Sequence, residues 1–294
     1  MLELHSINRS FGERQVLHDV SFTVERGRMT GFVGGNGAGK TTTMRVILGV
    51  LAADSGTVTL DGSPVTAEAR TDFGYMPEER GLYPKMPVAE QIVYLGRLHG
   101  MPVDEAKKST DALLDKLGLG PRANDTVESL SLGNQQRAQI AAALVHNPEV
   151  LVLDEPFSGL DPLAVEVVLN VLKDFASQGA PVLFSSHQLD IVERLCDDLV
   201  VIADGEIRAS GSREGIRAAH SSPRFELQLA GDAGWLRTET GVTVLDFAGG
   251  YALFEVDSDE TAQRVLQRAI TEGSVERFGP KLPSLAQIFT EVIQ

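Results

Sequence analysis

The 294-residue chain has few of the features that mark disulfide-rich, nucleic-acid-binding or membrane-spanning proteins. Its single cysteine, Cys196, excludes an internal disulfide and a multi-thiolate zinc site, and we interpret it as a small core residue. Basic residues are also few, since 26 Lys and Arg stand against 41 Asp and Glu, a net charge of −15. This acidity argues against non-specific binding to nucleic acid or anionic lipid.

Long apolar runs are absent from the sequence as well. No uninterrupted run approaches the roughly 18 residues that a membrane span needs. The first ten residues lack the basic-then-apolar order of a secretion signal. We therefore expect a cytoplasmic protein that does not insert into a membrane and that has a membrane role only through a partner. Hydrophobic residues make up 43% of the chain, which is enough to bury a sizeable core.

The hydrophobic pattern predicts an α/β fold with a mostly parallel, buried sheet, because short apolar strands alternate with amphipathic helices. Strands are predicted at 20–24, 29–33, 56–60, 150–153, 182–185 and 199–202. Helices are predicted at 41–48, 135–145, 163–176 and 189–195, and helical spacing over 88–119 indicates an insertion between sheet elements.

The chain changes character after Gly211, where a polar, small-residue-rich stretch begins. Strands are predicted at 225–229, 242–247 and 251–256, with a hairpin turn at Gly249-Gly250, and helices at 260–271 and 284–293. We expect three parts: a first α/β domain at 1–211 with its helical insertion at about 83–145, a linker at 212–223, and an accessory α+β domain at 224–294.

Residues 34–41, GGNGAGKT, match the phosphate-loop pattern G-x-x-x-x-G-K-[ST]. The match follows a predicted strand and opens a predicted helix, so backbone amides at the helix's positive end converge on phosphate oxygens. A glycine-rich turn with an exposed lysine is the alternative interpretation. Lys40 would reach the β and γ phosphates and the Thr41 hydroxyl would hold Mg²⁺. The predicted ATP-binding residues here are Gly34, Asn36, Gly37, Ala38, Gly39, Lys40, Thr41 and Thr42.

Polar residues follow two other predicted strands. Asp154 and Glu155 come directly after the apolar run at 150–153, at the end of a strand where open α/β sheets bind ligands. Asp154 suits Mg²⁺, and Glu155 suits a general base for water attacking the γ-phosphate. His187 follows the strand at 182–185 and is placed to hydrogen-bond the γ-phosphate or the attacking water.

Together the segments LSLGNQQR at 130–137, LVLDEP at 151–156, SGLD at 158–161 and SH at 186–187 resemble the ATPase subunit of ATP-binding-cassette (ABC) transporters. The resemblance implies a P-loop NTPase cassette with a mostly parallel sheet, an antiparallel β subdomain and a helical insertion. It also implies two subunits that sandwich two nucleotides. Ser131, Gly133 and Asn134 would then contact the nucleotide of the partner subunit, and Asp161 would couple the two sites. An ordinary helix cap is the alternative role for Ser131.

Three positions depart from the commonest family pattern: Gly35 replaces a proline, and Asn134 and Glu78 each replace a glutamine. A carboxylate at Glu78 adds negative charge near Mg²⁺ and is a candidate metal ligand beside Thr41 and Asp154. PEERGLY at 77–83 and LSLGNQQ together resemble the branch that includes sodium-efflux and drug-exporter ATPases. Phe11 resembles the aromatic residue that stacks on adenine, with a core aromatic as the alternative.

The resemblance therefore implies an enzyme that hydrolyses ATP as a subunit of a bacterial-type ABC exporter. It would form a homodimer around two Mg-ATP molecules and power export of ions or drug-like molecules through a separate integral-membrane permease. The segment at about 83–98 would dock the permease and hold the protein on the inner face of the cell membrane. The alternatives are a soluble ABC ATPase of translation or DNA repair, which usually has two cassettes or long coiled-coil insertions, and a non-catalytic scaffold.

Overall fold

The computed structural model describes residues 1–79, 81–219, 224–281 and 287–288. The chain divides after Arg213 into two compact units, which are described separately below. The strands of the first unit are β1 (Leu2–Phe11), β2 (Arg14–Val24), β3 (Met29–Val33), β4 (Ser55–Leu60), β5 (Ser63–Pro64), β6 (Phe73–Met76), β7 (Val150–Leu153), β8 (Val182–Ser186), β9 (Asp198–Ala203) and β10 (Glu206–Ser212). Its helices are α1 (Lys40–Ile47), α2 (Val88–Leu98), α3 (Val103–Lys116), α4 (Leu132–Leu144), α5 (Pro162–Ala176) and α6 (Leu189–Leu195).

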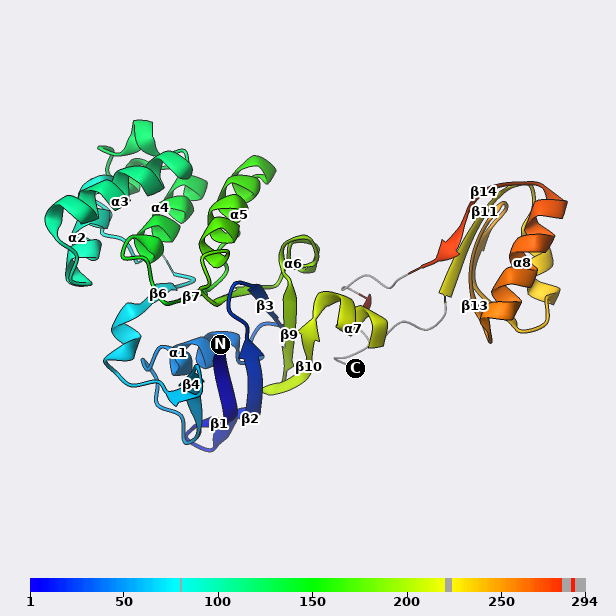
Figure 1. The fold of residues 1–294 in the computed structure, drawn as a ribbon, viewed down its shortest axis with the longest axis horizontal. Coiled ribbons are helices and arrows are strands. Elements are labelled where there is room, and N and C mark those ends of the chain that lie inside the picture. Colours follow the sequence, from blue (N-terminus) through cyan, green and yellow to red (C-terminus); the bar gives the residue numbers. More distant parts are fainter. Residues whose placement is uncertain (80, 220–223, 282–286, 289–294) are drawn as a thin grey trace. The chain divides into compact units, whose positions relative to one another are not determined.

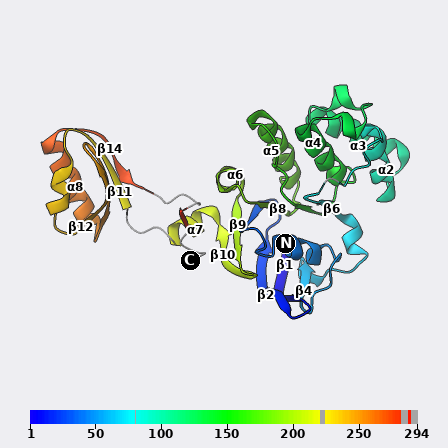
Figure 2. The ribbon, with the colours of Figure 1, turned by 180° about the vertical axis from the view of Figure 1, so that it is seen from behind.

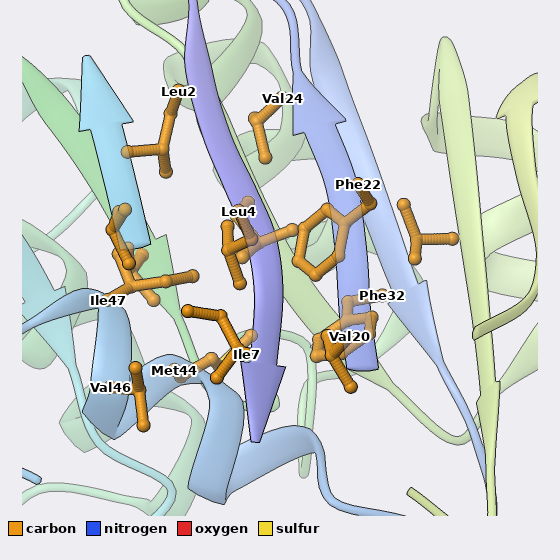
Figure 3. Close-up of a cluster of buried hydrophobic side chains, with 14 of the residues drawn as sticks. Leu2, Leu4, Ile7, Val20, Phe22, Val24, Phe32, Met44, Val46 and Ile47 are labelled. Carbon is orange, nitrogen blue, oxygen red and sulfur yellow. The ribbon is translucent and has the colours of Figure 1, made fainter. Parts of the chain in front are cut away.

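The first sheet of this unit is antiparallel and has the strand order β2-β1-β4-β5. Alternate residues of β1 and β2 turn their apolar side chains to one face, where the helix α1 and strand β3 cover them. Figure 3 shows this cluster. Its labelled members are Leu2, Leu4, Ile7, Val20, Phe22, Val24, Phe32, Met44, Val46 and Ile47. Because Phe32 lies on β3 and Met44 on α1, the cluster holds the antiparallel sheet against the strand and helix that flank residues 34–39.

The second sheet has the order β10-β9-β3-β8-β7-β6, and every neighbouring pair except β9 and β10 is parallel. All residues of β3, β7 and β8 are buried, as a sheet covered on both faces requires. Since the strands are parallel, the residues that follow β3, β7 and β8 emerge at the same edge. This edge is where the candidate functional residues meet.

Helices α2, α3 and α4 form a group of their own between β6 and β7 in the sequence. Figure 1 shows the group apart from strands β1, β2 and β4, and Figure 2 shows the same arrangement from behind. Helix α4 also packs on β6, where Gly74 lies so close to α4 that a Cβ atom would stand 2.4 Å from the Ala143 carbonyl oxygen. The helical insertion is therefore joined directly to the parallel sheet.

The second unit contains α7 (Arg213–Ala219), β11 (Arg224–Ala230), β12 (Val242–Ala248), β13 (Tyr251–Val256), α8 (Asp259–Glu272) and β14 (Ser274–Pro280). Its antiparallel strands have the order β12-β13-β11-β14, and a short 3-10 helix, η4 (Gly234–Thr238), follows β11. This is a split βαβ arrangement with a shortened first helix. Buried side chains of β11, β13 and α8 form its core, among them Leu227, Phe254 and Val265.

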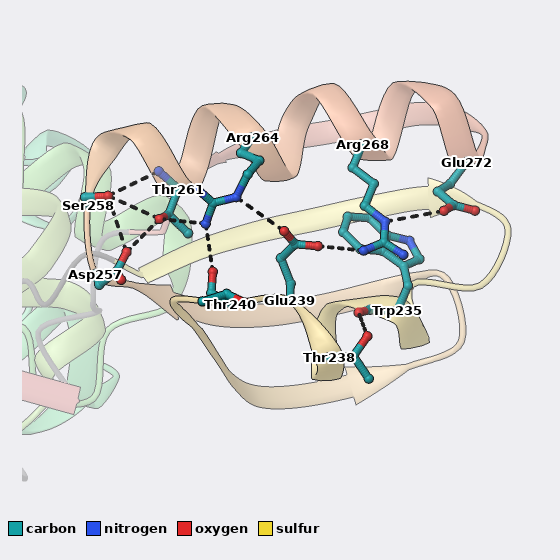
Figure 4. A network of polar contacts seen from close by, with 10 residues as sticks. All are labelled: Trp235, Thr238, Glu239, Thr240, Asp257, Ser258, Thr261, Arg264, Arg268 and Glu272. Carbon is teal, nitrogen blue, oxygen red and sulfur yellow. Dashed lines mark hydrogen bonds and ion pairs between the residues drawn. The ribbon is translucent and has the colours of Figure 1, made fainter.

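Polar contacts join α8 to the segment after β11 (Figure 4). Glu239 accepts hydrogen bonds from Arg264 at 3.3 Å and from Arg268 at 2.7 Å, and the Arg268 guanidinium lies 4.7 Å from the Trp235 ring centroid. Ser258 caps α8 by accepting a hydrogen bond from the Thr261 backbone N–H at 3.2 Å. These contacts explain how a helix with a mostly polar outer face is held on a small sheet.

The α/β prediction is confirmed, and the predicted strands and helices in the described residues are found with boundaries shifted by a few residues. The sequence analysis missed β1, β5, β6, β10, α7 and β14. Of these, β1, β10, α7 and β14 carry mixed or charged patterns, whereas β5 and β6 have only two and four residues. Helix α4 begins at Leu132 and not at 135, because Ser131 caps its first turn. In the stretch predicted as a linker, Ile216 is buried and 213–219 form α7. The helix predicted at 284–293 lies outside the described residues, except for Gln287 and Ile288.

Cys196 is buried, as predicted, and burial raises the pKa of its thiol to about 12. Among the residues that the structure describes, no helix is both long enough and apolar enough to span a membrane.

The contact between β6 and α4 yields a stability prediction. Gly74→Ala should lower the free energy of unfolding by about 1–3 kcal/mol, because the new methyl group meets a backbone carbonyl that cannot rotate away. Thermal denaturation of the full chain measures the effect. Gly81→Ala is the matched control, since its Cβ would meet only Pro77 at an ordinary 3.7 Å. Equal melting temperatures for the two variants would contradict the close approach.

Candidate functional site

The phosphate loop connects β3 to α1 and has the backbone conformations that its glycines permit. Gly37 and Gly39 have φ values of 78° and 111°, and Gly39 is the residue before the first turn of α1. Gly34 lies against β9, where a Cβ would stand 2.4 Å from the Ile202 carbonyl oxygen. Lys40 folds back over the loop, and its Nζ donates to the carbonyl oxygens of Gly34 at 2.8 Å and Gly35 at 3.2 Å. The loop thus leaves the amino end of α1 open for an anion.

Asp154 connects the phosphate loop to the next two strands. It follows β7, is 1% exposed, and its Oδ2 accepts a hydrogen bond from Thr41 Oγ1 at 2.8 Å. Its Oδ1 accepts a hydrogen bond from Ser185 Oγ on β8. The same Ser185 oxygen accepts the backbone N–H of Glu155 at 2.9 Å. One serine therefore orients both members of the carboxylate pair.

Glu155 is held in an uncommon backbone conformation and is 8% exposed. Its φ of 53° lies in the left-handed region, which a non-glycine side chain adopts only when its surroundings impose it. Its carbonyl oxygen accepts a hydrogen bond from Gln136 Nε2 at 2.9 Å, and its Oε1 lies 2.9 Å from His187 Nδ1. The His187 side chain is half exposed, so one of its faces remains open to solvent.

These residues line an open cleft of about 570 Å³. Its lining consists of Arg14, Val16, Asn36, Gly37, Gly39, Lys40, Thr41, Thr42, Glu78, Asp154, Glu155 and His187. The cleft therefore contains six of the eight predicted phosphate-loop residues. It also contains the predicted catalytic and metal-binding residues that follow β6, β7 and β8, namely Glu78, Asp154, Glu155 and His187. The other two loop residues, Gly34 and Ala38, are buried and do not line the cleft.

Thr41, Asp154 and Glu78 supply only oxygen atoms toward this cleft, which is the donor type that Mg²⁺ prefers. Among the described residues, no group of three or more His, Cys, Asp or Glu side chains could hold a metal ion by itself. The residues thus fit an ion that takes only part of its coordination from protein and the rest from phosphate oxygens and water.

The remaining predicted site residues do not line the cleft. Ser131 and Asp161 lie at the first turns of α4 and α5, where each side chain caps its own helix by accepting a backbone N–H, at 3.3 and 2.8 Å. Gly133 and Asn134 lie in the first turn of α4, and Asn134 accepts a hydrogen bond from Arg137. Phe11, at the end of β1, is 49% exposed and is not a core aromatic.

Four residues of the site were missed in the sequence analysis: Ser185, Gln136, Arg14 and Val16. Ser185 is the last residue of the strand predicted at 182–185. The rule that polar residues at strand ends form ligand sites, which pointed to Asp154, could therefore also have identified Ser185. Gln136 follows the LSLGN segment, but its contact with Glu155 joins parts of the chain 19 residues apart. Arg14 and Val16 reach the cleft only because β2 packs beside the phosphate loop.

A phosphate loop between a parallel strand and a helix, with an Asp-Glu pair at a neighbouring strand end, defines a P-loop nucleoside triphosphatase. The ABC transporter family matches residues 17–158, and the C-terminal domain of DrrA1-3-like ATP-binding proteins matches residues 211–293. The ABC transporter ATP-binding protein YhaQ of Bacillus subtilis is 35% identical over 293 residues, covering 100% of this chain and 98% of that protein. This chain belongs to the ABC transporter ATP-binding family.

Two further relatives have names that state a function. The linearmycin resistance ATP-binding protein LnrL of Bacillus subtilis is 37% identical over 216 residues, 72% of this chain and 70% of that protein. The Nod factor export ATP-binding protein I of Burkholderia lata is 38% identical over 214 residues, with the same coverage of 72% and 70%. Proteins of this family bind and hydrolyse ATP, work with membrane permeases and typically dimerise.

Solved structures agree with this assignment. A solved ATP-binding subunit of an ABC transporter has a TM-score of 0.69 and 32% identity, over 74% of this chain and 92% of that chain. A nucleotide-free ATP-binding cassette from an ABC transporter has a TM-score of 0.68 and 28% identity, over 76% and 96%. The family resemblance and the cassette fold predicted from the sequence are therefore confirmed.

The two hydrogen bonds of Ser185 generate a prediction. Ser185→Ala leaves the buried Asp154 carboxylate and the Glu155 N–H each without one partner, and should cost about 1–3 kcal/mol of unfolding free energy. ATP turnover should fall as well. Chemical denaturation and a phosphate-release assay measure the two effects. Ser177→Ala, which removes an exposed hydroxyl on α5's far end, is the control. A Ser185 variant as stable and active as this control would refute the role.

Proposed function

We propose that this chain is the ATP-hydrolysing subunit of an ABC exporter, working as a homodimer around two Mg-ATP molecules and driving a separate permease. The observation that carries the proposal is the meeting of Lys40, Thr41, Asp154, Glu155 and His187 in one cleft. In this proposal the protein is cytoplasmic and bound peripherally to the inner face of the cell membrane through its permease.

The predicted site residues have roles that their positions support. The amides of the loop and the Lys40 ammonium bind the phosphates, and Phe11 stacks on the adenine. Thr41, Asp154 and Glu78 would hold Mg²⁺, which when bound would offset the negative charge of the phosphates. The Glu155 carboxylate takes the proton of the attacking water. His187, 2.9 Å from that carboxylate, positions it and contacts the γ-phosphate.

The homodimer accounts for the site residues that lie outside the chain's own cleft. Ser131, Gly133 and Asn134 form the exposed or half-exposed start of α4, where backbone N–H groups and the helix dipole favour an anion. In the proposed dimer they contact the γ-phosphate bound by the partner subunit. Asp161, at the start of α5, couples the two sites. Closure of the dimer would act directly on the proposed base, because Gln136, which is also in α4, donates a hydrogen bond to the Glu155 carbonyl oxygen.

The helical insertion is the proposed permease dock. Tyr83, Tyr94 and Leu98, within or just before α2, are 62%, 42% and 63% exposed, an apolar surface that a cytoplasmic helix of a permease would cover. Glu78 lies upstream in the same connection and lines the cleft. Motion at the nucleotide is thereby linked to the docking segment.

Export, with ions or drug-like molecules as cargo, is favoured by the relatives named for linearmycin resistance and Nod factor export.

We propose that 1–211 form the ATPase domain, with 212–223 joining it to an accessory domain at 224–294. A soluble ATPase of translation or DNA repair is not favoured, because the sequence carries one copy of each cassette motif. The transported molecule is chosen by the permease.

The role of Glu155 can be tested with an isosteric change. Glu155→Gln keeps the side-chain volume and the backbone bonds but removes the base, so ATP should still bind while turnover falls at least about a hundredfold. A nucleotide-bound dimer should accumulate, which gel filtration with Mg-ATP would detect. Glu105→Gln, an exposed carboxylate on α3, is the control. Turnover within about twofold of wild type would remove Glu155 as the base.

The role of Lys40 generates a binding prediction. Lys40→Ala removes a cation from the phosphate loop, and the dissociation constant for Mg-ATP should rise more than about tenfold. Equilibrium titration with the full chain measures this constant. Lys107→Ala removes an exposed cation from α3 and should leave binding unchanged. Undiminished ATP binding by the Lys40 variant would count against the phosphate-loop assignment.

A further inference from the structure

Phe11 lies at the end of β1, which pairs with β2. In the hairpin between β1 and β2, Phe11 is directly opposite Arg14, and Arg14 and Val16 line the cleft. Residues opposite each other in an antiparallel pair have side chains on the same face of the sheet. Phe11 therefore lies on the same face of the hairpin as Arg14, a residue that lines the cleft.

The Arg9 side chain contacts this ring. The Arg9 guanidinium carbon lies 4.9 Å from the Phe11 ring centroid, so the cation covers part of the ring. The Arg9 side chain is 22% exposed and its Nη1 donates to Asp54 Oδ1 at 2.7 Å. The guanidinium is thus held between a carboxylate and an aromatic ring.

Asp54 is itself fixed by the antiparallel sheet. Its Oδ2 accepts the Ser10 backbone N–H at 2.6 Å, and its own N–H donates to the Asn8 carbonyl oxygen at 2.8 Å. The hydrogen bond from Ser10, together with Arg9, holds the pKa of Asp54 below its ordinary value, so the carboxylate is charged at neutral pH. The strand β1 and the start of β4 therefore determine where the Arg9 guanidinium stands.

A half-exposed aromatic ring at the end of a strand has rotational freedom that stacking on a base would have to remove. A guanidinium packed against the ring removes part of that freedom before the nucleotide arrives. It also leaves the rest of the ring surface available for a base.

We propose that the Asp54–Arg9 pair is a positioning element that holds Phe11 ready to stack on the nucleobase of ATP. This inference rests on the proposed role of Phe11 and adds two residues that act through it. Neither residue lines the cleft that holds the phosphate loop, so the pair should strengthen binding of the base and leave the triphosphate interaction unchanged.

The test compares a ligand that has a base with one that lacks it. Dissociation constants of the full chain are measured for Mg-ATP and for magnesium tripolyphosphate. Arg9→Ala should raise the constant for ATP about threefold to tenfold and leave that for tripolyphosphate within about twofold. The KM for ATP should rise while kcat stays unchanged. Arg237→Ala, which removes a guanidinium 4.4 Å from the Phe247 ring in the second unit, is the matched control.

A double-mutant cycle then distinguishes positioning from direct contact. If Arg9 acts through Phe11, Arg9→Ala should have little further effect in a Phe11→Ala background. Asp54→Asn should also weaken ATP and spare tripolyphosphate, and it serves as a second variant should Arg9→Ala fold poorly. Additive effects of Arg9→Ala and Phe11→Ala, equal losses for both ligands, or unchanged ATP binding would each overturn the proposal.

The outcome for the wild-type chain separates this inference from the proposed function. If the wild type binds neither ATP nor tripolyphosphate, the phosphate-loop assignment fails and the positioning element has no ligand. If it binds both and Arg9→Ala binds ATP as tightly as wild type does, the proposed function stands and only the positioning element is refuted.

Discussion

The buried carboxylate of Asp154 is the interaction on which the functional edge of the sheet depends. A charge that is 1% exposed is tolerated only when hydrogen bonds compensate its lost hydration. Thr41 and Ser185 provide these bonds from the first turn of α1 and the end of β8. The same hydrogen bonds connect the first turn of α1 and the ends of β7 and β8 around the cleft. The bonds that stabilise the buried carboxylate therefore also position the residues of the site.

The helical insertion is connected to this edge of the sheet by close packing and by a hydrogen bond. Packing joins α4 to β6 so closely that Gly74 has no room for a side chain. A single polar contact, from Gln136 to the Glu155 carbonyl oxygen, then reaches the backbone of the proposed base. Because the Glu155 backbone is in the left-handed region, it depends on such external contacts. The insertion thus contributes directly to holding the Glu155 backbone in this conformation.

Much of the fold was predictable because the buried strands are short, apolar runs bounded by glycine or polar residues. Strands β3 and β7 and helix α6 were predicted with the boundaries that the structure has. Strands β1 and β14 were missed, since both carry charged residues along their length and form part of antiparallel sheets. In such sheets one face is solvated, so the hydrophobic pattern is weaker than in a strand buried on both faces.

The sequence by itself determined the family, the phosphate loop and the Asp-Glu pair, because these depend on residues adjacent in the chain. Neighbouring glycines, a lysine and a strand-end carboxylate express their chemistry through local backbone geometry. Only the tertiary structure decided which distant groups support them. Ser185 and Gln136 bond to the Asp-Glu pair, and Arg9 pairs with Asp54 beside Phe11, through contacts between elements distant in sequence. Such contacts follow from how the sheets and helices pack, and among these residues only Ser185, which lies at a strand end, has a local pattern that could have marked it.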